Sequence, residues 1–203
     1  MNQTRIDLKG VTYMRIILII FSICFLYACQ LTAQPKTAKT VEMYNREGDM
    51  IGTAKLSEDS KGVKMKLKLE GLRSGFHGIH IHEVAKCEHP DFISAGNHLN
   101  PDKKKHGLLH QDGAHLGDLP NIEADDKGKV DTELTVSEAT LLQGKNSLTE
   151  KGGTSIIITS EPDDGMTQIS GNSGNRIICG EIKEKKNETD AEKPTDPTEE
   201  EKK

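Results

Sequence analysis

The sequence of 203 residues contains no tryptophan, and aromatic residues make up only 3% of it. A hydrophobic core must therefore be built from Val, Ile and Leu, while the 19 glycines supply many turns. Short aliphatic runs separated by turn residues favour a β-rich fold. The central part of the chain also lacks a basic cluster and the net charge is −5, which argues against nucleic acid as a partner.

No apolar run reaches the length of a comfortable transmembrane helix. The apolar run at residues 16–28 follows three basic residues, as in an export signal. It ends in Leu-Tyr-Ala before Cys29, which resembles the bacterial lipoprotein processing box, in which the cysteine is lipidated and becomes the mature N-terminus. We therefore expect residues 1–29 to be a signal peptide, and the mature protein to be extracytoplasmic and anchored to the cell membrane through Cys29.

Two features of this N-terminus stay open. An uncleaved anchor or a plain secretory signal would also explain the apolar run, and Met14 is an alternative start to Met1. Each alternative still places the folded domain outside the cytoplasm.

Cysteine is scarce, with four residues in the chain. Cys24 lies in the apolar run and Cys29 is the lipidation candidate, so only Cys87 and Cys179 belong to the folded domain. A pair of cysteines in an exported domain suggests a disulfide, whereas two unpaired thiols would be unusual in an oxidising compartment.

The rest of the chain divides by composition into three parts. Residues 30–39 are small and polar, as in a tether, and residues 184–203 are too polar to offset their ordering entropy, so we expect that tail to be disordered. The domain at residues 40–183 contains short runs with strand-like alternation or β-branched composition, separated by turns and two long Gly-rich loops. These predicted strands are residues 40–44, 51–56, 63–69, 78–82, 129–136, 155–159 and 176–182.

All eight histidines fall between His77 and His115, in and before the loop of residues 83–119. Such a loop has no core of its own, and cross-linking through a metal would order it. His80 and His82 are two residues apart on a predicted strand, so their imidazoles share one face. His77 has the opposite parity and is expected to be a packed, hydrogen-bonded residue rather than a ligand.

The loop itself supplies His98, His106, His115 and Asp118. Three imidazoles and one carboxylate suit a closed tetrahedral zinc site. A His-rich surface loop without metal is the alternative.

Several segments together resemble the copper-zinc superoxide dismutase family. They are GFHGIHIHE at residues 75–83, SAGNHLNP at 94–101, HLGDLPN at 115–121 and GNSGNRIICG at 171–180. The resemblance implies an all-β fold, an eight-stranded Greek-key β-barrel with long metal-binding loops. It also implies that superoxide is converted to oxygen and hydrogen peroxide by copper that cycles between two oxidation states.

The resemblance assigns roles to individual residues. Zinc would be held by His98, His106, His115 and Asp118, and copper by His80, His82 and His98, with His98 bridging the metals. The remaining roles are the family disulfide for Cys87 and Cys179, guidance of the anionic substrate for Arg176, and a carboxylate linking the two ligand sets for Asp163.

One family position departs from the pattern. The fourth copper histidine should stand at the end of a strand, where this chain has Thr159. A neutral hydroxyl is a poor copper ligand, so we expect copper binding to be weak or absent while zinc binding is intact. His89 and His110 are the substitutes that the loop offers.

Two classes of function follow from this ligand count. The first is a zinc-stabilised, metal-binding lipoprotein of the family with weak or absent dismutase activity. The second is an active copper-zinc superoxide dismutase that uses a three-histidine or substituted copper site, with superoxide as its substrate. A homodimer stays open, because a barrel face with few aromatic residues gives no interface signature.

Overall fold

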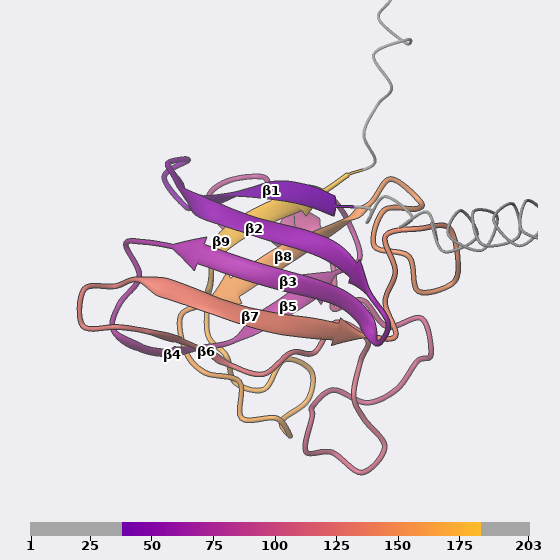
Figure 1. Ribbon diagram of the computed structural model, residues 1–203. Coiled ribbons are helices and arrows are strands. Elements are labelled where there is room, and N and C mark those ends of the chain that lie inside the picture. Colours follow the sequence, from indigo (N-terminus) through magenta and orange to yellow (C-terminus); the bar gives the residue numbers. More distant parts are fainter. Residues whose placement is uncertain (1–37, 184–203) are drawn as a thin grey trace, which may run out of the picture. The chain divides into compact units, whose positions relative to one another are not determined.

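The computed structural model describes residues 38–183, which form nine antiparallel strands and one 3-10 turn. The strands are β1 (Ala38–Asn45), β2 (Met50–Asp59), β3 (Gly62–Leu69), β4 (Gly75–His77), β5 (Ile79–His82), β6 (Ile122–Ala124), β7 (Val130–Ser137), β8 (Thr154–Thr159) and β9 (Arg176–Ile182), and the turn is η1 (Ile93–Ala95). In Figure 1, β1, β2, β3 and β7 form one wall, with β9, β8 and β5 behind it.

The strands form a curled antiparallel sheet of seven strands and a second sheet of two. Seven of them pair in the order β5-β8-β9-β1-β2-β3-β7, and β4 pairs with β6. Only Gly78 separates β4 from β5, so these two act as one interrupted strand and the barrel has the eight strands that were expected. A tight turn at residues 125–129 joins β6 to β7 and links the two ends of this order. The connections from β3 to β4 and from β7 to β8 join strands that are not neighbours, which is the Greek-key arrangement.

The core lies inside the curl and follows the period of two. On β3, Val63, Met65 and Leu67 are fully buried while the intervening lysines face outward. Ile79 and Ile81 of β5 join the same core, so His80 and His82 project from the opposite face of that strand. The parity argument for this histidine pair is confirmed.

The observed elements differ from the predicted ones mainly at their ends. β1 begins at Ala38, inside the segment predicted to be a tether, because Ala38 and Lys39 pair with Ser57 and Leu56 of β2. The three-residue strands β4 and β6 were not predicted, since each is too short to show alternation and they exist through their pairing with each other. The two long loops, residues 83–119 and 161–175, are present as expected, with η1 in the first.

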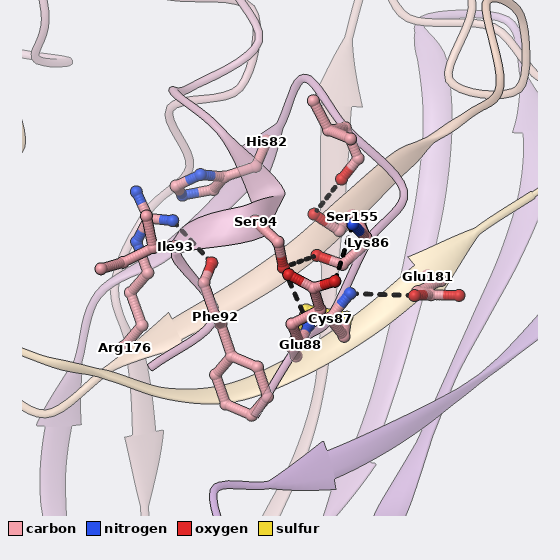
Figure 2. The surroundings of a disulfide bond; sticks show 12 residues. His82, Lys86, Cys87, Glu88, Phe92, Ile93, Ser94, Ser155, Arg176 and Glu181 are labelled. Atoms are coloured by element: carbon pink, nitrogen blue, oxygen red, sulfur yellow. Dashed lines mark hydrogen bonds and ion pairs between the residues drawn. A yellow bond between two sulfur atoms is a disulfide. The ribbon is translucent and has the colours of Figure 1, made fainter. Parts of the chain in front are cut away.

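β8 is buried along its whole length, because both of its faces are covered. Ile156 and Ile158 point into the main core, whereas Ile157 packs with Phe92 and Cys179 in a second apolar cluster. Phe92 belongs to the first long loop, which therefore lies against the outer face of β8 and β9. This second cluster explains why the loop is held to the sheet beside the disulfide (Figure 2).

Cys87 and Cys179 form the expected disulfide, across a sequence separation of 92 residues. It ties the start of the long loop to β9, and the Cys87 backbone N–H also donates to the Glu181 carboxylate at 2.9 Å. The chain segment that carries Phe92 is therefore attached to the sheet twice, by the disulfide and by the packing of Phe92 in the second apolar cluster.

Replacing both cysteines by serine is expected to lower the free energy of unfolding by about 4 kcal/mol, because the crosslink restricts a long loop in the unfolded chain. Urea unfolding of the zinc-loaded double variant and of the parent would measure this. A loss below about 1 kcal/mol would contradict a stabilising role for the crosslink.

No helix in the described range, residues 38–183, is long and apolar enough to span a membrane. The predicted signal peptide with Cys29, most of the predicted tether and the polar tail at residues 184–203 lie outside the described residues. The prediction of a lipid anchor therefore rests on the sequence.

Candidate metal centre

The fold brings the predicted ligands together in two groups. His98, His106, His115 and Asp118 form the first, and His80, His82 and His98 form the second; within each group the potential ligand atoms lie within 4.8 Å of one another. His98 belongs to both groups. These two groups are the metal-binding clusters found among the described residues 38–183.

Asp118 is the centre of the first group. Its Oδ1 lies 2.8 Å from His98 Nδ1, 3.2 Å from His106 Nδ1 and 3.3 Å from His115 Nδ1. Its Oδ2 accepts hydrogen bonds from the backbone N–H groups of Gly107 and His115, each at 2.9 Å. Three Nδ1 atoms and one carboxylate oxygen thus converge, as in a tetrahedral zinc site without an open position.

The protonation states suit metal binding. Burial lowers the pKa of His98 to about 4 and lowers that of His82 well below its usual value. Both imidazoles are therefore neutral at pH 7, which is the form that binds a metal. Burial by itself would raise the pKa of Asp118, but the nearby His115 and His98 imidazoles and the hydrogen bond from the Gly107 backbone hold that pKa below its usual range.

In the second group, hydrogen bonds fix the nitrogen that each ring offers. His82 Nδ1 donates to the Gly96 carbonyl at 3.0 Å, which leaves Nε2 free. His80 Nε2 donates to Asp163 Oδ2 at 2.7 Å, which leaves Nδ1 free. His98 turns Nδ1 toward Asp118 of the first group, so that Nε2 is the nitrogen it can offer to a metal in the second group.

Asp163 connects the two groups. One carboxylate contacts His80 of the second group at 2.7 Å and His106 of the first at 3.2 Å, as the family resemblance implied. This contact requires glycine at position 171, where an added Cβ would lie 1.8 Å from Asp163 Oδ1. Such carboxylates orient metal-binding imidazoles and raise their basicity.

Two buried atoms test whether these residues fit metal ions. His80 Nδ1 and His115 Nδ1 are buried side-chain nitrogens without a hydrogen-bond partner among the described residues. A buried polar atom without a partner is costly, and one of these two atoms belongs to each ligand group. A metal ion on each side would satisfy them, so the first donor set fits zinc, and the second offers three imidazoles of the kind that bind copper.

Thr159 stands where the family resemblance placed the missing histidine. It ends β8, is 4% exposed, and lines a cavity of about 400 Å³ together with His82, His98 and Arg176. Its hydroxyl donates to the Glu161 carbonyl at 3.2 Å, and its backbone N–H donates to the Gly78 carbonyl. The ligand group on this side contains the three imidazoles of His80, His82 and His98, and residue 159 adds a hydroxyl rather than a fourth imidazole.

Arg176 reaches the same cavity from the first residue of β9. Its guanidinium donates to the carbonyl of Phe92 at 2.8 Å (Figure 2). It also donates to the carbonyl of Gly96 at 2.8 Å. The Gly96 carbonyl also accepts the hydrogen bond from His82. The loop held by the disulfide therefore positions both the Arg176 guanidinium and the His82 imidazole. The sequence did not reveal the roles of the Phe92 and Gly96 carbonyls, because every residue has a backbone carbonyl and residue identity does not show which one accepts a hydrogen bond.

The other histidines have separate roles. His77 is buried, with Nδ1 at 2.9 Å from the Thr159 carbonyl and Nε2 at 2.8 Å from the Arg73 carbonyl, so it is the packed residue that its parity predicted. His89 is exposed and packs edge-on against Phe92, and His110 Nδ1 accepts a hydrogen bond from the Asp112 backbone. Neither belongs to a ligand group of the described chain.

Comparison with known proteins agrees with this architecture. Residues 50–182 match the family described as Copper/zinc superoxide dismutase (SODC). The chain is 46% identical to Cu-Zn superoxide dismutase 1 of Aquifex aeolicus over 144 residues, which cover 70% of this chain and 85% of that protein. It is 40% identical to the superoxide dismutase-like protein YojM of Bacillus subtilis over 145 residues, covering 70% of this chain and 74% of that protein.

Among solved structures, similarity is found with a double mutant of a SOD-like protein from Bacillus subtilis, in which a tyrosine and a proline are replaced by histidine. The TM-score is 0.70 with 40% sequence identity, and the match covers 71% of this chain and 97% of that one. The fold and the two histidine groups define a metal-binding β-barrel. This chain belongs to the copper/zinc superoxide dismutase family.

Proposed function

We propose that this chain is an extracytoplasmic, lipid-anchored member of the family with weak or absent superoxide dismutation. It binds zinc at full occupancy and copper only weakly. Zinc is held by His98, His106, His115 and Asp118. The disulfide supports a location in an oxidising compartment. The single observation that carries the proposal is the contrast between four converging zinc donors and three on the copper side, where Thr159 stands instead of an imidazole.

Copper, when bound, supplies the one-electron chemistry that the family uses on superoxide. The residues of this chain provide the surroundings: Arg176 attracts the anion to the cavity, and Asp163 and the Gly96 carbonyl orient His80 and His82. Among the described residues 38–183, this ligand group has three imidazoles and no fourth, and copper(II) prefers four donors in a tetragonal arrangement.

Metal content and superoxide consumption of the purified full chain test the proposal together. We expect about one zinc per chain and copper well below one, with slow superoxide consumption after copper is supplied. Elemental analysis gives the metal content, and pulse radiolysis gives the rate.

The second candidate is an active dismutase with a three-histidine copper site. It is favoured by one observation, namely that Arg176 lines the same cavity as His82 and His98. Near-stoichiometric copper with fast turnover in the unmodified chain would establish this candidate and exclude a weak copper site.

A further inference from the structure

We propose that the pocket formed by His80, His82 and His98 binds copper(I) in preference to copper(II). This inference rests on the proposed function, because it concerns the same incomplete site, and it specifies which oxidation state the site retains. Three features of the pocket carry it: the number of donors, their charge, and the sharing of His98.

The number of donors favours copper(I). The group contains three imidazoles, and the hydroxyl at the fourth position already donates its hydrogen to the Glu161 carbonyl. Gly78 packs against that hydroxyl, where even a Cβ on residue 78 would lie 2.5 Å from the Thr159 oxygen. Copper(II) prefers four donors in a tetragonal arrangement, whereas copper(I), which has a filled d shell and no such geometric preference, accepts two or three.

The charge of the pocket acts in the same direction. All three donors are imidazoles rather than carboxylates or thiolates, and their side chains are nearly or fully buried. The carboxylates of Asp163 and Asp118 lie against the far nitrogens of His80 and His98, and each is already shared with His106 of the first group. The guanidinium of Arg176 lines the cavity as a full positive charge, and the carboxylate of Glu83 at the rim is already bonded to Asn97. Burying an ion costs more as its charge rises, so a monovalent ion is less disfavoured here than a divalent one.

The sharing of His98 adds to this preference. Its Nδ1 lies 2.8 Å from Asp118 in the first group. A zinc ion bound there would lower the basicity of Nε2, which is the nitrogen that faces the copper pocket. His80 and His82 alone still form a pair, with ring centroids 6.3 Å apart and each ring oriented by its own hydrogen bond. Two oriented imidazoles are a sufficient set for copper(I) and a poor one for copper(II).

The preference is measured by titrating the zinc-loaded full chain with each ion separately. Copper(I) is offered under anaerobic conditions in competition with bicinchoninate, and copper(II) in competition with nitrilotriacetate. We expect the copper(I) dissociation constant to be at least about 100-fold below that for copper(II). Equal constants, or tighter binding of copper(II), would overturn the inference in the unmodified chain.

Thr159→His tests the cause of the preference. The added imidazole should tighten copper(II) binding more than copper(I) binding and so reduce the ratio of the two constants by about 10-fold or more. Thr53→His, on the outer face of β2 away from the cavity, is the matched control and should leave the ratio unchanged. An unchanged ratio in Thr159→His, with zinc content and thermal midpoint like those of the parent, would also overturn the inference.

These measurements separate this inference from the proposed function. Zinc content and the rate of superoxide consumption test the proposed function, namely a complete zinc site and weak dismutation. Neither measurement depends on which copper ion binds more tightly. A chain with one zinc, slow turnover and no copper(I) preference would retain the proposed function and lose the inference.

Discussion

Replacing Thr159 with histidine is expected to raise copper occupancy to near one per chain and to increase superoxide consumption at least about 10-fold. The physical reason is local. Residue 159 lines the cavity of about 400 Å³ that also contains His82 and His98, so an imidazole there can join the existing donors. The ring is accommodated by the cavity rather than by the core, because the inward-facing neighbour at this end of β8 is Ile158.

The measurement combines elemental analysis with the rate of superoxide consumption after copper is supplied. Thr53→His is again the matched control, because it adds a histidine without adding a copper ligand. If Thr159→His bound no more copper than the parent while retaining its zinc and its thermal midpoint, the missing ligand would not be the cause of weak binding.

Loss of Asp118, a proposed zinc donor, is expected to have the second large effect. Asp118→Asn should weaken zinc binding at least about 100-fold and lower the free energy of unfolding by about 3 to 5 kcal/mol. The carboxylate faces three imidazoles and accepts two backbone N–H groups, so one residue holds the loop at several points. Removing its charge therefore removes both a metal donor and the partner of buried nitrogens.

Hydrogen exchange measured by mass spectrometry would locate this effect. Exchange should rise across residues 83–119, both in Asp118→Asn and in the parent after zinc is chelated, since metal-binding energy is folding energy in that loop. Asp112→Asn is the control, because this exposed aspartate lies in the same loop and belongs to neither ligand group. Unchanged exchange across the loop in the zinc-free protein would show that contacts within the protein are sufficient to order it.

Much of the fold was predictable because alternation is strong in the strands that face the core. β3 and β9 lie where the pattern placed them, with β9 at the same bounds. β4 and β6 were not predicted, since a strand of three residues is too short to show alternation and the pairing of these two strands with each other decides their structure. The first residues of β1 were assigned to a tether for a similar reason: their pairing with β2 is invisible in a stretch of small polar residues.

For the metal centre, the residue identities alone establish which side chains are available: the clustered histidines, the aspartate that follows them, one cysteine pair, and threonine at the end of β8. Residue identity is a chemical property of the chain, so it could be read before any fold was known. The tertiary structure decided which nitrogen of each ring is free, because Gly96, Asp163 and Asp118 occupy the others. It also decided that the Thr159 hydroxyl is bonded to the Glu161 carbonyl, since hydrogen bonds between segments distant in sequence or made to backbone atoms depend on positions that only folding sets.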